Sequence, residues 1–126
     1  MTPEAFFIDY LTTALTPPPV NGVAQAGVPV SGSVPHAMPA EFVTVELTGS
    51  GQVDKIDRVT ITVLSWSTSR DAACALFTRV NAAMLSSPEK DEVSRCELET
   101  GYNDTDTETH RPRYHARYGI VYLGGN

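Results

Sequence analysis

Acidic and imidazole side chains alternate in a polar stretch near the carboxyl end of the sequence. Asp104, Asp106, Glu108 and His110 are each separated by one residue, and carboxylates and imidazoles are ligands of divalent cations. The stretch lacks the glycine at the sixth position and the terminal glutamate that define an EF-hand loop. A solvated acidic loop is therefore the favoured interpretation, and magnesium or calcium bound between subunits is the alternative.

No residue pattern indicates nucleophilic or acid–base catalysis. Ser31, Ser33 and Ser50 have glycine neighbours, but no GxSxG sequence follows a predicted strand. His36 lies among prolines and His115 lies in a predicted strand, where ordinary polar surface positions are the favoured interpretation. A nucleophile needs a base within reach and a group that orients it. We therefore expect neither enzymatic activity nor a bound cofactor.

The composition indicates one acidic domain over residues 1–126. Nine Lys and Arg against fifteen Asp and Glu give a net charge of -6, and no segment forms the basic patch that nucleic-acid binding requires. No apolar run approaches the ~20 residues of a membrane helix. The first basic residue is Lys55, so no signal-peptide n-region is present and a cytosolic protein is expected. Cys74 and Cys96 show no metal or redox spacing and are expected to be reduced and mostly buried.

The first elements that must position these residues are a helix and a long arm. Thr2, Pro3 and Glu4 form a helix start, and apolar residues then recur every three or four positions until Pro17. Residues 17–40 carry six prolines, three glycines and no formal charge, which is typical of a functional arm or a linker. Its valines suggest a short extended piece at a sheet edge: Val28, Val30 and Val34.

The rest of the chain alternates between strands and a second helix. Period-two patterns predict strands over 41–47, 58–66, 92–100 and 113–123, with a glycine turn from Gly49 to Asp57 and a polar loop over 101–110. A helix capped by Thr68 or Ser69 runs to the serines before Pro88. This order predicts an α+β fold with a mainly antiparallel sheet of four to five strands, covered by helices on one face.

Two features of the predicted sheet suggest contacts between molecules. Trp66 falls on the strand face opposite the aliphatic set, so it either marks an interface or packs under the first helix or the arm. Arg111, Arg113 and Arg117 give the last strand a basic edge. This edge either protects the strand against unwanted pairing or makes salt bridges with an acidic part of a neighbouring copy.

Several segments together resemble the tail terminator (tail completion, minor tail) proteins of long-tailed bacteriophages and prophages. The resemblance is carried by the run from Val28 to Val45 with its P-x-x-F-V-x-V strand, the turn Gly49-Ser50-Gly51, and the strand end Leu64 to Ser69 before an alanine-rich helix. The late segment Arg111-Pro112-Arg113-Tyr114 also resembles the family. The likeness lies in the order of the segments, the length of the chain and the general residue pattern, and it covers nearly the whole chain.

The resemblance implies a structural protein of the virion tail, assembled in the bacterial host cytoplasm, that caps the tail tube and ends its polymerisation. It implies a six-fold ring whose partners are other copies, the major tail tube protein and the head–tail connector proteins, with no membrane. DNA only passes through the lumen, past acids such as Asp104 and Asp106. The candidate subunit or tail interface comprises Val28, Val30, Val34, His36, Phe42, Trp66, Arg111, Arg113 and Tyr114.

Two other function classes stay open at this point. Another head–tail connector or minor capsid protein would share the small α+β texture, and its position in the particle would distinguish it. A small-molecule-binding regulatory domain would bind a ligand that raises its melting temperature and would leave tail length unchanged.

Overall fold

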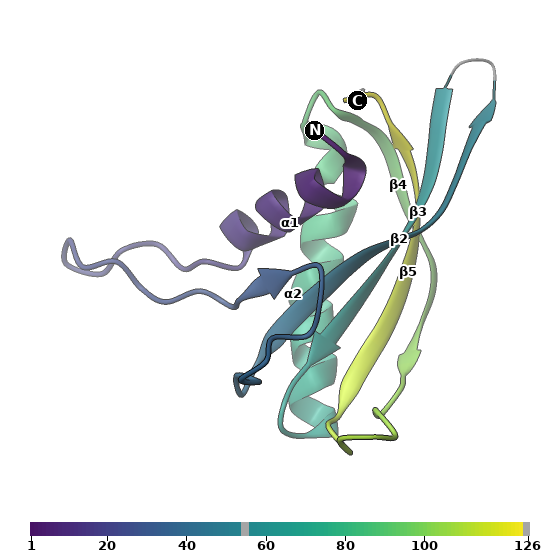
Figure 1. Cartoon of the computed structure of the whole chain (residues 1–126). Helices are drawn as coiled ribbons and strands as arrows, with labels where there is room; N and C mark the ends of the chain where they lie inside the picture. The colour runs from purple at the N-terminus through teal and green to yellow at the C-terminus, as the bar shows by residue number, and fades with distance from the viewer. Residues whose placement is uncertain (54–55, 125–126) are drawn as a thin grey trace.

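The chain folds into one five-stranded sheet with two α-helices, as a computed structural model describes it for residues 1–53 and 56–124 (Figure 1). The α+β class and the predicted order of elements are confirmed. The elements are α1 (Pro3–Ala14), β1 (Val30–Ser31), β2 (Phe42–Val53), β3 (Ile56–Trp66), α2 (Arg70–Leu85), the 3-10 turn η1 (Ser87–Glu89), β4 (Val93–Asn103) and β5 (Arg113–Tyr122).

The sheet is mixed, with the strand order β1-β2-β3-β5-β4. The pairs β2–β3, β3–β5 and β5–β4 are antiparallel, whereas the predicted edge piece β1 runs parallel to β2, with Val30 opposite Val43. Both helices lie on one face of the sheet, as predicted (Figure 1). We call the opposite face the helix-free face.

Local sequence signals set the ends of both helices. The Thr2 hydroxyl accepts a hydrogen bond from the Ala5 amide at 3.1 Å, which satisfies one of the free donors at the start of α1. Ser69, the second of the two predicted caps, does the same for the Ala72 amide at the start of α2. Prolines follow each helix and remove the donors that would extend it.

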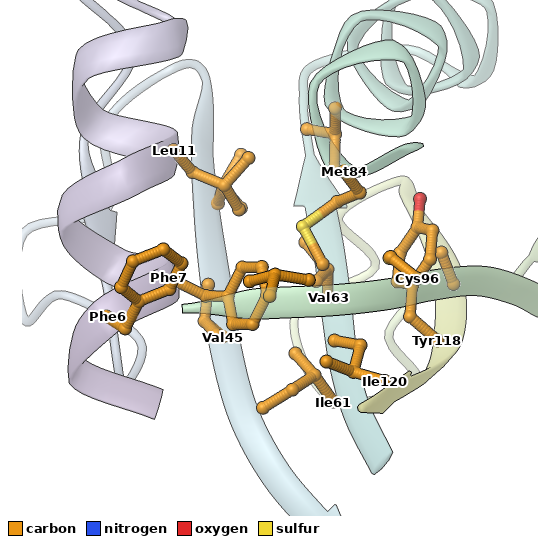
Figure 2. Packing of buried hydrophobic residues seen from close by; sticks show 14 of the residues in the cluster. Phe6, Phe7, Leu11, Val45, Ile61, Val63, Met84, Cys96, Tyr118 and Ile120 are labelled. Atoms are coloured by element: carbon orange, nitrogen blue, oxygen red, sulfur yellow. The ribbon is translucent and has the colours of Figure 1, made fainter. Parts of the chain in front are cut away.

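The core lies between the helices and the inner face of the sheet (Figure 2). Alternate positions of the strands point into it, as the period of two predicts. Tyr118 is fully buried there, and its hydroxyl donates to Asn81 Oδ1 at 3.0 Å. Burial raises the pKa of Tyr118. The fully buried aliphatic residues of the core include Leu11, Val43, Val45, Ile61, Val63, Leu76 and Val80.

The prediction of a turn from Gly49 to Asp57 is wrong for residues 49–53 and 56–57, which lie in paired strands. β2 continues to Val53 and β3 begins at Ile56, with Gly49 opposite Thr60 and an irregular register between Leu47 and Gly49. The predicted turn also covers residues 54–55, which lie outside the described residues. Glycine favours turns by its own conformational freedom, but here cross-strand pairing keeps the segment extended.

Three side chains are more exposed than their patterns predict. Leu47 and Leu98 are each 37% exposed, and Cys74 is exposed on α2, whereas Cys96 is buried as expected. β4 begins at Val93 and continues to Asn103, with register shifts between Val93 and Arg95 and between Leu98 and Thr100. These shifts break the strict alternation of faces that the sequence pattern assumes. Among the described residues, no helix is long and apolar enough to cross a membrane.

Candidate interaction surface

Trp66 is buried, so the expectation of an exposed interface tryptophan is wrong. Its ring is 3% exposed and stacks on Phe42 with centroids 5.1 Å apart, and its Nε1 donates to Thr44 Oγ1 at 3.2 Å. A cavity of about 410 Å³ on the helix-free face is lined by Trp66 together with Val34 and Met38 of the arm. The arm therefore lies across the cavity from Trp66, whose own ring contacts are Phe42, Thr44 and Arg113.

Arg111 joins the end of the arm to the end of β3. Its Nη2 donates to the carbonyl oxygens of Pro39 and Ala40 at 2.9 and 2.8 Å, and its Nε donates to that of Ser67 at 3.2 Å. The guanidinium carbon also lies 5.7 Å from the centroid of the Phe42 ring. Donors in a planar fork suit several carbonyls at once.

Arg113 places a second guanidinium over the same aromatic pair, 5.0 Å from the centroid of Trp66. Its Nε donates to the Asp104 carbonyl oxygen at 2.8 Å. Its Nη2 lies 3.2 Å from Asp104 Oδ2, and its Nη1 lies 3.5 Å from Asp106 Oδ1. We call the set Phe42, Trp66, Arg111 and Arg113 the arm anchor.

The acidic stretch is a loop whose two aspartates bind other groups of the same chain. Asp106 accepts hydrogen bonds from the amide and the hydroxyl of Thr109, at 3.0 and 2.5 Å, and these bonds lower the pKa of Asp106. Asp104 Oδ2 lies 3.6 Å from His115 Nδ1. Within residues 1–53 and 56–124, no three acidic, histidine or cysteine side chains converge on a point that could hold a metal ion.

The predicted basic edge is wrong because β5 is an interior strand, between β3 and β4. Arg117 Nε lies 3.3 Å from Glu99 Oε1 of the same chain, and Arg111 and Arg113 belong to the arm anchor. All three arginines therefore have partners within the chain.

The structure distributes the other predicted interface residues over three places. Val28 is 9% exposed and Val30 is half-buried in β1. Tyr114 faces the helices and stacks on Phe77, with centroids 4.3 Å apart. Val34 and His36 are exposed, so these two alone keep the free surface that an interface residue needs.

Sequence reasoning missed a projecting loop in the first half of the arm, over residues 16–28, which we call the finger (Figure 1). At its tip, Val20 and Val23 exchange backbone hydrogen bonds of 3.0 and 2.9 Å, and Asn21 and Gly22 have φ values of 51° and 78°. Two positive φ values are the mark of a type I′ turn. Asn-Gly between two valines was the sequence signal for it.

The finger ends at a narrow neck. The Val28 amide donates to the Leu15 carbonyl at 3.3 Å. A Cβ added at Gly27 would lie only 2.9 Å from the backbone Cα of Thr16, so the two strands of the neck touch. The tip valines are 55% and 63% exposed. The finger is thus an ordered projection with an apolar end.

A groove of about 410 Å³ lies along one side of α1. Its wall is mainly apolar or aromatic, and its rim carries charges at Asp9, Lys90 and Glu92. Tyr10 is held in the wall by a 2.7 Å hydrogen bond from its hydroxyl to the Ala83 carbonyl. The remaining lining residues are Met1, Phe6, Thr13 and Ala14.

The two outer strands of the sheet differ in how well they are protected. β4 carries charged side chains, which discourage the addition of another strand. Register shifts occur in both β4 and β2 and do not distinguish the two. In the part of the chain that the structure describes, β1 covers only Val43 and Thr44 of β2. Beyond them, the Leu47 amide donates to Glu4 Oε1 at 2.9 Å. We call the uncharged remainder of that strand, Thr48–Val53, the open edge.

The chain matches no protein-family model and no curated protein. Its function therefore has to be inferred from its own surfaces. Those surfaces offer an open edge, an apolar finger and a groove, all of which suit contact with another polypeptide. The buried thiol of Cys96 is a poor nucleophile, because burial raises its pKa to about 11.

Proposed function

We propose that this chain is a structural virion protein that caps the tail tube of a long-tailed bacteriophage. In this role it ends tube polymerisation and forms the tail side of the head–tail joint as a hexameric ring. Its partners are further copies of itself, the major tail tube protein and the head–tail connector proteins, and DNA passes through the lumen. The resemblance of its strand entry, alanine-rich helix and late arginine–tyrosine segment to tail terminators supports this proposal.

The open edge of β2 is the observation that carries the proposal furthest. An edge without charges, proline or a covering strand pairs readily with another chain, and natural proteins normally protect such edges. Thr48–Val53 has no charged residue, and its two glycines leave little side chain to obstruct a partner. An edge of this kind is expected where a neighbouring subunit supplies the missing contact.

The distribution of charge also suits a channel for DNA. The net charge is -6, and an acidic wall repels phosphates and so prevents DNA from sticking. Asp104 and Asp106 bind Arg113, so replacing them with lysine would disturb the arm anchor as well as the charge. Exposed acids outside the ion pairs of the described residues, such as Glu46, are therefore better positions for testing the lumen by charge reversal.

A regulatory domain that binds a small molecule is the second candidate, because the groove beside α1 is mainly apolar and has the size of a ligand site. It predicts a monomer or dimer whose melting temperature rises with an apolar ligand. It also predicts that deleting the protein leaves tail length unchanged.

The deciding experiment combines solution mass with tail length. Light scattering over a concentration series, with and without tail tube protein, is expected to show a species of six times the chain mass. Phage or prophage lacking the protein is expected to produce tails of uncontrolled length. Normal tail length without the protein would contradict the proposal.

A variant of the open edge sharpens this experiment. Ser50→Lys places a charge on the exposed edge and is expected to reduce ring formation. Thr78→Lys makes the same charge change on the exposed outer side of α2 and serves as the matched control. Equal loss of assembly in both variants would show that the edge has no special part.

A further inference from the structure

We propose that the finger of one copy docks, tip first, in the groove beside α1 of a second copy. This inference rests on the proposed function, because it names a second contact between neighbouring subunits, in addition to the open edge. It assigns the occupant of both surfaces at once: the two exposed tip valines enter the groove, and the turn that carries them meets the groove's rim.

The finger is prepared for binding because its shape is already fixed. The type I′ turn, the bond from the Gln25 side chain to the Val23 carbonyl at 2.9 Å and the neck all order it within one chain. A projection that is ordered before it binds loses less conformational entropy on docking than a flexible tail. Two valines that are more than half exposed gain by burial in an apolar site.

The groove suits the finger in chemistry. Its wall presents the rings of Phe6 and Tyr10 to the apolar tip. The finger carries no formal charge, so docking would bury no unpaired ion beside the wall.

The rim of the groove carries Lys90 as well as two acids, and the acids offer hydrogen-bond acceptors to the turn. The hydrogen bonds that close the turn use the backbone groups of Val20 and Val23. The amides of the two central residues, Asn21 and Gly22, are therefore free to donate to a partner. Asp9 and Glu92 place exposed carboxylates on the rim, and hydrogen bonds to a charged acceptor are stronger than neutral ones.

The occupant is a second copy because the finger cannot reach the groove of its own chain. The neck holds residues 15 and 28 together, and the finger projects beyond the carboxyl end of α1, away from the sheet (Figure 1). Finger and groove are different surfaces, so each copy can give one contact and receive another. Such head-to-tail interfaces close into rings when the rotation between copies fits.

Disulfide trapping tests the contact directly, even if the association is weak. One chain carries Val23→Cys and the other carries Thr13→Cys, and both positions are exposed. Both chains also carry Cys74→Ser, which removes the native exposed thiol. A disulfide forms only when the two Cα atoms come within about 7 Å. Cys96 stays largely protonated near pH 8, because its pKa is about 11, and does not compete.

The control pair replaces the Thr13→Cys chain with a chain that keeps only its native thiols, so that Cys74 on α2 is the exposed target. Under mild oxidation, the mixed dimer of Val23→Cys with Thr13→Cys is expected to form about tenfold faster than the control dimer, in line with contact-driven thiol exchange. Equal rates would overturn the proposal.

A second measurement uses no cysteine. Val20→Ser with Val23→Ser is expected to weaken self-association by about tenfold or more, because two apolar side chains lose their burial. Leu98→Ser, which changes an exposed aliphatic residue of β4 outside the finger and the groove, is the control and is expected to have little effect.

The outcomes separate this inference from the proposed function. If the Val20→Ser, Val23→Ser variant forms hexamers as well as the unchanged chain does, and the cysteine pair gives no disulfide-linked dimer, the finger contact is overturned. The tail-capping role would still stand. A trapped dimer in a protein whose loss does not alter tail length would keep the contact and overturn the tail-capping role.

Discussion

The two halves of the proline-rich arm share a composition but differ in their contacts. The finger, residues 16–28, projects from the molecule and ends in two exposed valines. We call residues 29–40 the anchored segment. Val30 and Ser31 of this segment pair with β2, and Arg111 donates hydrogen bonds to the carbonyl oxygens at its end. Both halves contain three prolines and carry no formal charge. Long-range partners, and not local composition, therefore decide which half is fixed to the domain.

Removing Phe42 is expected to have the largest effect on this difference. Its ring is fully buried against Trp66 and lies beneath Arg111, so Phe42→Ala should lower the free energy of unfolding by about 3–5 kcal/mol. Urea unfolding followed by circular dichroism measures it. Tyr102→Ala, at a ring that is 46% exposed, is the control, and a similar cost in both variants would contradict the role of the anchor.

Removing Arg111 is expected to release the anchored segment specifically. Arg111→Ala loses three hydrogen bonds to backbone carbonyls, and a partly exposed set of this kind should contribute about 2–3 kcal/mol. Hydrogen exchange should rise at residues 29–40 and stay unchanged in the finger. Arg111→Lys, which keeps the charge but loses the planar fork, should restore less than half of the protection.

A methyl group at the neck tests whether the finger is held by close packing. Gly27→Ala forces its Cβ against the Thr16 backbone, and overpacking of this kind should cost about 1–3 kcal/mol. Gly51→Ala is the control, because nothing lies within 4 Å of its added Cβ. If the two variants unfold at the same urea concentration, the neck is not closed.

Lowering the pH is expected to weaken the arm anchor, because Asp106 binds Arg113. The pKa of this carboxyl is lowered from its ordinary 3.8, mainly by the Thr109 hydrogen bonds. Its contribution to stability is therefore complete above pH 3.8 and is lost as the pH falls through the lower, folded-state value. Stability measured from pH 5 downward should fall less in Asp106→Asn than in the unchanged chain, and parallel profiles would contradict this.

The smallest effect on stability is expected at the finger tip. Val20→Ser with Val23→Ser should change the free energy of unfolding by less than about 0.5 kcal/mol, because both side chains are already exposed. Val28→Ser, at the 9% exposed end of the finger, should destabilise the fold clearly. A tip variant as unstable as the Val28 variant would show that the two regions do not differ as described.

Periodicity predicted most of the fold. Alternation at Val59, Ile61 and Val63 and the three-to-four spacing in α1 each place residues on the core face by geometry alone. Gly49 and Gly51 misled the prediction, because the preference of glycine for turns yields to pairing with β3. Which residues oppose each other across a sheet depends on register, which short patterns do not encode.

The candidate surfaces were harder to predict for a physical reason. Trp66 packs against Phe42 and Arg113, which are far from it in sequence, so its burial depends on tertiary contacts. The tip turn, in contrast, was predictable from Asn21-Gly22 and was overlooked among the prolines. The groove beside α1 also includes residues 90 and 92, and no local pattern brings these to the helix.

Trp66 is the only tryptophan in the sequence, so tryptophan fluorescence reports on the surroundings of this one residue. Trp66 is 3% exposed, lies against Phe42 and carries the Arg113 cation over its face, so its fluorescence reports on the arm anchor and on no other part of the molecule. Emission shifted to short wavelength corresponds to a seated anchored segment, and a red shift corresponds to its release into water. If the proposed ring forms, its assembly can be followed in real time and without a label, as a change in the emission of this one site.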